Sequence, residues 1–506
     1  MDPDQIGQHF IVDFDGSAVT PQVERLVREG RIGGVILFAK NVRSPDQVRC
    51  LCADLQALVR DAGLPPMFIS VDQEGGLVNR LVDGFTVFPS AMALGASGRE
   101  DDVTAAGRIT AGELRSVGIN TNHAPVLDVN TDPTNPVIGV RAFGEDPEAV
   151  GRLGSAYLRA AQAAGVLPTV KHFPGHGATS VDSHLDLPIV DKDRATLDRE
   201  ELVPYAAALR AGAKAVMAAH IVFSALDPSR PVTLSPAPIN GLLRGELGFD
   251  GVVFTDSMAM KAIADRWSRR ESAVASLLSG FDLVLACGTE SEQWESINGA
   301  RQAATDGTLT TADLRVSAER IRRIKSSYAV VATGGEVGTA EHLRIAEEIA
   351  GRAVTLVKCA RGRIPMAPGR TAVVNMTSQW REAAGAFAGL LRERGADVTL
   401  IDAADRITED QWGSVVAVTL SWRTAPAAEQ VRRLHARFGD RLLVVGLGNP
   451  YELAGFPEVS TYLATYGPDP ASLHAAAKVL TGALEPTGRL PVTIPGLFPR
   501  GHRAGL

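Results

Sequence analysis

The segment from Lys171 to His184 carries three histidines within thirteen residues, the densest group of chemically active side chains in the sequence. It reads Lys-His-Phe-Pro-Gly-His-Gly and, after four further residues, Asp-Ser-His. The two glycines make the segment flexible, so we expect a polar loop. Three histidines could ligate a metal ion, but metal ligands in a barrel converge from several strands, whereas His176 and His184 lie in one loop. We therefore expect no metal site.

Asp182 and His184 form a second pattern in the same loop, because they are two residues apart. In an extended loop the carboxylate can hold one imidazole nitrogen and fix its tautomer. Such a pair suits His184 to act first as a general acid and then as a general base. A surface turn with the histidine in water would give the same triplet. The triplet alone leaves both interpretations open.

Two acidic residues also follow apolar runs. Asp256 comes after one such run, where a carboxylate could attack an electrophilic carbon or simply cap the next helix. Asp72 lies in Val-Asp-Gln-Glu-Gly-Gly, where two glycines let the backbone approach a ligand and the carboxylate can accept two hydroxyl hydrogen bonds. Arg80, Arg141 and Lys171 supply donors of the kind that a polyhydroxylated ligand needs. The pattern favours a sugar site.

Eight short β-branched runs, separated by longer amphipathic stretches such as 45–61 and 146–164, must position these residues. This alternation predicts parallel strands joined by helices. Six of the runs end on polar residues, and a parallel barrel builds its active site at the carboxyl ends of its strands. We therefore predict an N-terminal (β/α)8 TIM-like barrel, with an open doubly wound sheet as the alternative. The predicted strands are 9–13, 34–38, 67–72, 121–128, 167–172, 215–220, 252–256 and 282–287.

A glycine-rich stretch after the eighth run predicts a linker at 332–340, which divides a barrel at 1–331 from a second α/β domain at 341–506. We expect this second domain to be an α/β sandwich with helices at 341–352 and 425–438. Its turn Gly446-Leu447-Gly448-Asn449-Pro450 resembles half of a dinucleotide fingerprint, but the third glycine is missing, so we expect no cofactor there. Its strands are predicted at 354–357, 372–375, 398–401, 415–420, 442–445 and 461–465.

Composition excludes several classes of function. Hydrophobic residues make up 45% and charged residues 22% of the 506, as in ordinary globular proteins rather than disordered ones. With 51 Lys plus Arg against 58 Asp plus Glu and no basic run, nucleic-acid binding has no electrostatic source. No apolar stretch is long enough to cross a membrane, and the chain opens on an acidic sequence unlike a signal peptide. Four cysteines without framework spacing predict reduced thiols, so we expect a cytoplasmic protein.

The motifs together resemble glycoside hydrolase family 3, and within it the bacterial β-N-acetylglucosaminidases, over nearly the whole chain. The loop from Lys171 to His184 is the most specific of them. Other branches of the family take their acid/base from a glutamate of the second domain, and Glu429 and Glu452 show no signature of such a role. The segments that carry the resemblance are 34–38, 71–76, 124–129, 141–147, 171–184, 254–256 and 488–492.

This resemblance implies a retaining glycosidase that needs no metal or organic cofactor. Asp256 would be the nucleophile, and Asp182 with His184 the acid/base dyad. The leaving group would depart as Asp256 forms a covalent glycosyl-aspartate, which water then hydrolyses with His184 as the base. The residues implied for sugar binding are Asp72, Arg80, Arg141, Lys171 and His172.

Two positions depart from the family pattern. Leu77 stands where the family commonly has arginine, and Val140 stands where related chains often have aspartate. Both departures remove polar groups near the expected sugar site, which puts the leaving-group preference in doubt. The sequence does not indicate an oligomeric state.

Three functions stay open at this stage. The first is removal of terminal β-linked N-acetylglucosamine from cell-wall muropeptide or chitin fragments. The second is a phosphorylase with the same dyad, because a histidine, unlike a glutamate, does not repel incoming phosphate. The third is a sugar-binding protein without activity, against which the presence of both aspartates and the histidine argues.

Overall fold

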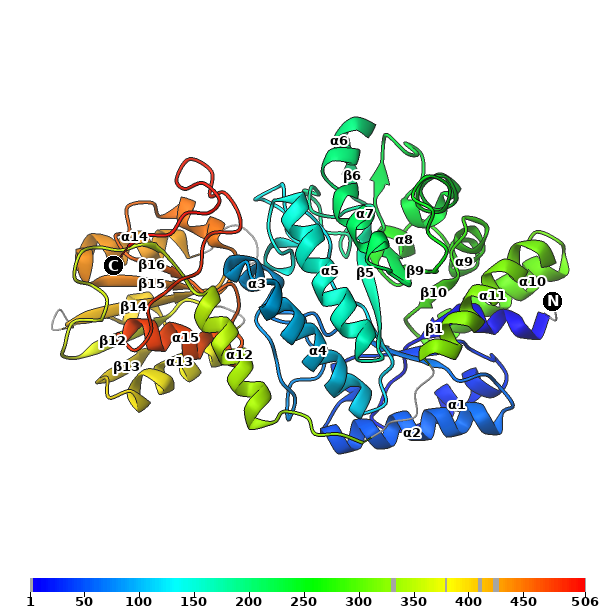
Figure 1. Cartoon of the computed structure of the whole chain (residues 1–506), viewed down its shortest axis with the longest axis horizontal. Helices are drawn as coiled ribbons and strands as arrows, with labels where there is room; N and C mark the ends of the chain where they lie inside the picture. The colour runs from blue at the N-terminus through cyan, green and yellow to red at the C-terminus, as the bar shows by residue number, and fades with distance from the viewer. Residues whose placement is uncertain (1–2, 329–333, 378–379, 408–411, 422–426, 506) are drawn as a thin grey trace.

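A closed barrel of eight parallel strands forms the N-terminal part of the chain, as the alternation of runs predicts (Figure 1). The computed structural model describes residues 3–328, 334–377, 380–407, 412–421 and 427–505. Around the barrel the strands follow the order β1-β10-β9-β7-β5-β4-β3-β2. Closure leaves no free edge, so the open-sheet alternative is wrong. The strands are β1 (Phe10–Val12), β2 (Gly34–Leu37), β3 (Phe68–Val71), β4 (Thr121–Asn122), β5 (Leu167–Phe173), β7 (Ala215–Ala218), β9 (Val252–Ser257) and β10 (Leu283–Ala286).

Helices cover the outside of the barrel, and several begin at the capping signals of the sequence. The Ser44 hydroxyl accepts from Gln47 N at the start of α2, and the Asp146 carboxylate accepts from Ala149 N at the start of α5, each followed by proline. Both helices confirm the predicted segments to within one residue. The helices are α1 (Pro21–Arg28), α2 (Pro45–Asp61), α3 (Ala91–Ser97), α4 (Glu100–Ser116), α5 (Pro147–Ala163), α6 (Arg194–Arg199), α7 (Leu202–Arg210), α8 (Lys261–Ala264), α9 (Arg269–Leu278), α10 (Glu290–Thr305) and α11 (Thr311–Tyr328).

The fourth strand is shorter than predicted. The apolar run 121–128 suggested one strand, but β4 keeps only Thr121 and Asn122. Pro125 follows soon after and has no N–H to donate to a ladder. A single bridge between Val126 and Lys171 continues the path beside β5, so Asp128 still reaches the carboxyl end of the barrel. An additional small sheet, β6 (Ile189–Val190) with β8 (Val222–Phe223), was not predicted.

The C-terminal part is a six-stranded sheet with helices on both faces, which confirms the predicted sandwich. The strand order is β11-β16-β15-β14-β12-β13, with only the β11–β16 pair antiparallel. Residues 422–426, which include the predicted start of one helix, lie outside the described residues. The elements are β11 (Thr355–Lys358), β12 (Thr371–Asn375), β13 (Val398–Ile401), β14 (Ser414–Thr419), β15 (Leu442–Gly446), β16 (Tyr462–Ala464), α12 (Ala340–Ala353), α13 (Arg381–Glu393), α14 (Ala428–Phe438) and α15 (Pro470–Leu480).

The two parts pack side by side, with α3, α4 and α12 between them (Figure 1). Two ion pairs cross from α12 to α4: Arg352 Nη2 lies 2.8 Å from Asp102 Oδ1, and His342 Nδ1 lies 2.7 Å from Glu113 Oε1. Residues 332 and 333 of the predicted linker lie outside the described residues, and 334–339 have no helix or strand. Within the described ranges, no helix is long and apolar enough to span a membrane.

Candidate active site

Carboxylates and cations from neighbouring strands meet at the carboxyl end of the barrel. Asp72 directly follows β3, and Lys171 lies in β5 with only 3% of its side chain exposed. Lys171 Nζ is 2.7 Å from Asp72 Oδ1 and 2.6 Å from Glu74 Oε1. Burial alone would raise the pKa of Asp72, but the charges of Lys171, His123 and Arg80 lower it to about 2. Asp72 is therefore an anion at neutral pH.

Arg141 and Glu74 form the second part of this cluster. The Arg141 guanidinium donates to both oxygens of Glu74, at 2.8 and 2.9 Å, and both side chains are at most 10% exposed. Against the effect of burial, Arg141 and Lys171 lower the pKa of Glu74, and Glu74 raises the pKa of Arg141. Such a bidentate pair fixes the guanidinium in direction as well as in place. The motif containing Glu74 was noted in the sequence, but its contact with Arg141 was not predicted.

His172 lies against the same guanidinium and is oriented by Asp128. Asp128 Oδ2 accepts from His172 Nδ1 at 2.7 Å, and Oδ1 accepts from the backbone N–H of His172 and of His176. Arg141 Nη2 is 3.3 Å from His172 Nε2, and a guanidinium can only donate. This geometry assigns the proton to Nδ1 and leaves Nε2 as an acceptor. Asp128 was noticed as a polar strand end and was missed as the orienting group.

Arg80 completes the set of residues predicted to bind the sugar. Its Nη2 is 3.7 Å from Asp72 Oδ2, and its guanidinium lies 5.7 Å from the centre of the Phe38 ring. All five predicted residues therefore lie close together and are linked by ion pairs and hydrogen bonds to one another or to Glu74. They are Asp72, Arg80, Arg141, Lys171 and His172.

Asp256 occupies the carboxyl end of β9. Its Oδ1 accepts from Ser257 N at 2.7 Å, and the carbonyl of Ser257 accepts from His220 Nε2 at 2.9 Å. Burial would raise the pKa of Asp256, but His172, His220 and Lys171 hold it below its ordinary value. The N-cap position of the next helix, α8, is Met260, and its side chain makes no capping hydrogen bond; Asp256 lies four residues earlier, so the helix-cap interpretation of Asp256 is wrong. A half-buried anion with this environment can act as a nucleophile.

The dyad predicted from Asp182 and His184 is formed. Asp182 Oδ1 lies 2.9 Å from His184 Nδ1 and accepts the His184 backbone N–H at the same distance. The Asp182 side chain is only 11% exposed, whereas that of His184 is 61% exposed. The His184 side chain is thus exposed to solvent, whereas the Asp182 carboxylate that contacts it is largely buried.

His176, which was noted in the sequence but given no role, ties down the loop that carries the dyad. Its Nδ1 is 2.7 Å from Thr179 Oγ1, and its Nε2 is 2.9 Å from Ser183 Oγ. Thr179 Oγ1 donates to the His176 carbonyl, so its oxygen accepts from Nδ1–H and Ser183 donates to Nε2. Burial and the neighbouring His172 lower the pKa of His176 to about 4. A neutral His176 therefore holds Ser183, the residue between Asp182 and His184.

His123 was not singled out in the sequence. It follows β4, is fully buried, and its ring packs edge-on against Phe254 with centroids 5.3 Å apart. Within the part of the chain that the structure describes, neither ring nitrogen has a hydrogen-bond partner. Burial lowers the pKa of His123 to about 4. A single histidine after a two-residue strand gave no sequence signal for this position.

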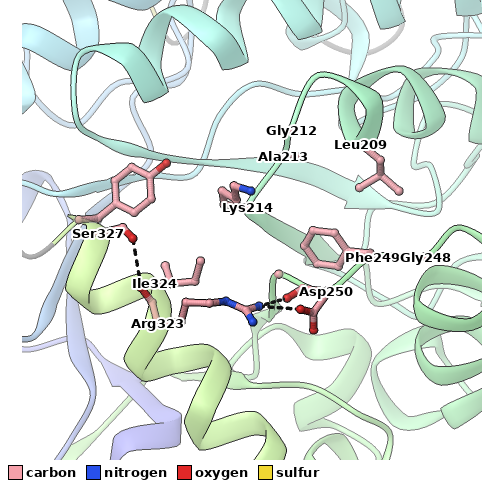
Figure 2. Close-up of a pocket in the computed structure, with 12 residues that line it drawn as sticks. Leu209, Gly212, Ala213, Lys214, Gly248, Phe249, Asp250, Arg323, Ile324 and Ser327 are labelled. Carbon is pink, nitrogen blue, oxygen red and sulfur yellow. Dashed lines mark hydrogen bonds and ion pairs between the residues drawn. The ribbon is translucent and has the colours of Figure 1, made fainter.

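A separate hollow opens at the opposite end of the barrel. It has a volume of about 400 Å³ and is lined by residues that precede β7 and β9, together with the end of α11. Figure 2 shows Arg323 paired with Asp250 across it, at 2.9 Å. None of the predicted site residues lines this hollow. In parallel barrels the carboxyl ends of the strands carry the chemistry, so the cluster around Asp72 and Asp256 is the candidate active site.

Among the described residues, no group of three or more histidine, cysteine, aspartate or glutamate side chains is arranged to hold a metal ion. The histidines of the loop instead have protein partners: Asp128 for His172, Thr179 and Ser183 for His176, and Asp182 for His184.

Comparison with known proteins places the chain in a family. Residues 3–324 match the model of the glycosyl hydrolase family 3 N terminal domain. β-Hexosaminidase A of Pseudoalteromonas piscicida is 31% identical over 94% of this chain and 92% of its own length. The structure of a family 3 β-N-acetylglucosaminidase from Paenibacillus sp. str. FPU-7 is 35% identical, with a TM-score of 0.91 over 98% of this chain and 99% of that one. A β-hexosaminidase of Alkalilimnicola ehrlichii is 38% identical over 55% of this chain and 80% of its own length. These matches confirm the resemblance: the chain belongs to glycosyl hydrolase family 3 and is a glycoside hydrolase.

Proposed function

We propose that this protein is a retaining, exo-acting β-N-acetylglucosaminidase. The observation that carries the proposal is the combination at one barrel end of an anionic, half-buried Asp256 and an Asp182–His184 dyad on an adjoining loop. Relatives with β-hexosaminidase and β-N-acetylglucosaminidase activity in their names support the same substrate class.

Asp256 is the proposed nucleophile. Its carboxylate attacks the anomeric carbon while His184 gives a proton to the departing glycosidic oxygen, and a glycosyl-aspartate forms. His184 then takes a proton from water as the water attacks the same carbon, which releases the sugar and restores Asp256. Asp182 fixes the orientation of the imidazole through Nδ1 and leaves Nε2 for proton transfer in both steps.

The proposed sugar-binding groups are those around Lys171. Asp72 accepts hydrogen bonds from sugar hydroxyls, and Arg80, Arg141 and Lys171 donate to sugar oxygens. Their mutual ion pairs hold them in place before the sugar arrives, so little ordering is left for the binding step. His172 lies at the same place, where its Nε2 accepts from Arg141 and helps to orient that guanidinium.

The natural substrate is proposed to be a cell-wall muropeptide or chitin fragment, met in the cytoplasm during peptidoglycan recycling. All four cysteines are free thiols, which supports a reducing compartment. No further partner is proposed beyond the small-molecule sugar.

Release of p-nitrophenol from the β-N-acetylglucosaminide and from the β-glucoside tests the proposal, with and without inorganic phosphate. Hydrolysis of the N-acetylglucosaminide alone, with the sugar first appearing as the β-anomer by NMR, is the expected result. A sugar 1-phosphate as the product would make the enzyme a phosphorylase. First appearance of the α-anomer would contradict the retaining mechanism, and turnover of the glucoside alone would contradict the substrate class.

A further inference from the structure

The turn 446–450, which resembles half of a dinucleotide fingerprint, is packed against protein on both sides. A Cβ at Gly448 would lie 2.3 Å from the carbonyl oxygen of Ser421, so the turn closes onto its own domain. On its other side the Asn449 side chain fills the space beside Gly139 of the barrel, where a Cβ would lie 2.4 Å from Asn449 Oδ1. Gly139 is two residues before Arg141 and has a φ of +45°, which favours glycine. The turn therefore touches the loop that carries a candidate sugar-binding residue.

Tyr451, the residue after this turn, reaches the same barrel loop through Asn130. The Asn130 amide donates to Tyr451 Oη at 2.7 Å. Asn130 Oδ1 accepts from Gly139 N at 3.2 Å, and Asn130 N donates to the carbonyl of Gly144 at 3.0 Å. Asn130 thus brackets the loop 139–144 at both ends, and Tyr451 orients the amide that does so.

The loop that carries Glu74 is also held against the C-terminal domain. A Cβ at Gly76 would lie 2.4 Å from Ser90 Cβ, so these two residues are in close contact. The Ser90 hydroxyl donates to the carbonyl of Tyr466 at 2.8 Å, across the boundary between the domains. Both members of the Glu74–Arg141 pair therefore stand on loops fastened to the second domain.

The two departures from the family pattern lie at the same boundary. Val140 is 2% exposed and belongs to an apolar cluster with Leu453, Phe456 and Tyr462 of the C-terminal domain, and Leu77 packs against that cluster. We expected these residues to alter the polarity of the sugar site. In the structure both residues pack in or against this cluster and add apolar contact between the site loops and the second domain.

We propose that the C-terminal domain is a positioning element of the sugar site, acting through Tyr451, Val140 and Leu77 on the loops that hold Glu74 and Arg141. This inference rests on the proposed function, because it takes Arg141 to bind the sugar. Tyr451, Val140 and Leu77 are positioning residues: Tyr451 acts on the loop of Arg141 through the Asn130 side chain, and Val140 and Leu77 act through their packing against the second domain. Loosening their contacts should weaken sugar binding more than it slows the chemical steps.

Tyr451→Phe and Val140→Ala test the inference in the full-length protein. Tyr451→Phe removes only the hydroxyl that accepts from Asn130, and Val140→Ala removes two methyl groups from the shared cluster. Val357→Ala is the matched control, since Val357 is fully buried in the same cluster but lies on β11, away from the site loops. The measurements are KM and kcat on the β-N-acetylglucosaminide, product inhibition by N-acetylglucosamine, melting temperature, and amide hydrogen exchange of residues 137–144.

Both test variants should raise KM and the inhibition constant about threefold, as expected for one lost buried contact, with kcat within about twofold. Exchange in 137–144 should become faster. Val357→Ala should lower the melting temperature as much as Val140→Ala does, with KM and exchange as in the wild type. Test variants that behave as the control does in KM and exchange would overturn the inference. A wild type without turnover would contradict the proposed function instead, and exchange in 137–144 would still decide the inference.

Discussion

Glu74 of the barrel and Glu452 of the C-terminal domain are both buried carboxyl groups, but their surroundings are opposite. Glu74 is bound by two cations, Arg141 and Lys171, which hold its pKa below the ordinary value. Glu452 accepts hydrogen bonds from the hydroxyls of Thr419 and Tyr462, and burial raises its pKa to about 7. The barrel end is thus arranged to hold charge, whereas the second domain holds a carboxyl group that is largely protonated below neutral pH.

This difference in charge indicates that the two domains have different roles. A site that stabilises an oxocarbenium-like transition state needs fixed charges that require no rearrangement during the reaction. The barrel provides them at the ends of β3, β5 and β9. Glu452 has a pKa suitable for an acid catalyst, but it is 4% exposed and engaged with its own domain, so a glycosidic oxygen cannot reach it. This supports our proposal that the Asp182–His184 dyad on the barrel loop is the proton donor.

Removal of the central anion should break the charged site most completely. We expect Asp256→Ala to lower kcat/KM on the β-N-acetylglucosaminide by about 10⁴, because no covalent intermediate can form. The melting temperature should change little, since the hydrogen bond that the Asp256 carboxylate makes among the described residues is a local one, from the N–H of its neighbour Ser257. Steady-state kinetics and calorimetry provide both numbers. Turnover near the wild-type level would show that the nucleophile is another residue.

Loss of the exposed dyad histidine should affect chemistry and spare stability. His184→Ala should lower kcat by roughly 10²–10⁴ on chitobiose, whose leaving group needs a proton. The effect on an activated aryl glycoside should be much smaller in the glycosylation step. Since the side chain is 61% exposed, unfolding should be unaffected. Equal losses on both substrates would count against His184 as the acid.

Breaking the barrel ion pair should cost both binding and stability. Glu74→Gln leaves Arg141 and Lys171 buried with less negative charge, so we expect the free energy of unfolding to fall by about 3 kcal/mol. The value of kcat/KM should fall about 10²-fold as Arg141 loses its fixed direction. Glu429→Gln is the control, because Glu429 pairs with Arg433 at the surface and should contribute below about 0.5 kcal/mol. Equal stability of the two variants would show that the buried pair is not a fixed element of the site.

The fold could be predicted from the sequence because strand and helix patterns are local. All eight barrel runs and all six strands of the second sheet were located from apolar runs. The length of β4 was wrong because the apolar run 121–128 continues past the point where Asn122 leaves the ladder. A run of apolar residues indicates that a segment is buried, but a buried segment need not be hydrogen-bonded to a neighbouring strand.

The site could be predicted only in part, because its contacts join residues distant in sequence. Lys171 and Asp72 were each recognised, but their ion pair joins residues 99 positions apart. The roles of Glu74 and Asp128 depend on such pairings and were missed. Leu77 and Val140 were recognised as departures from the family pattern. Their contacts with the second domain could not be predicted, because they depend on how the two domains pack. Residue types indicate which chemistry is available, and the tertiary structure decides which groups meet.

The smallest expected effect concerns Glu452 and appears only as a dependence of stability on pH. Its pKa is about 7 in the folded protein against an ordinary value of 4.5, so the unfolded chain releases this proton at lower pH than the folded chain. The free energy of unfolding should therefore be highest below pH 4.5 with respect to this group and fall by up to about 3 kcal/mol as pH rises through 7.

Glu452→Gln removes this titration. The free energy of unfolding of the variant minus that of the wild type should therefore be larger at pH 8 than at pH 5. Urea unfolding of both proteins at the two pH values measures the difference. Asp469, whose pKa burial raises to about 6, stays in both proteins and leaves a weaker slope of the same sign in the variant. Because we propose His184 and not Glu452 as the proton donor, turnover of chitobiose should stay within about twofold of the wild type. A large loss of that turnover, with the activated aryl glycoside spared, would instead make Glu452 the acid and erase the distinction between the two glutamates.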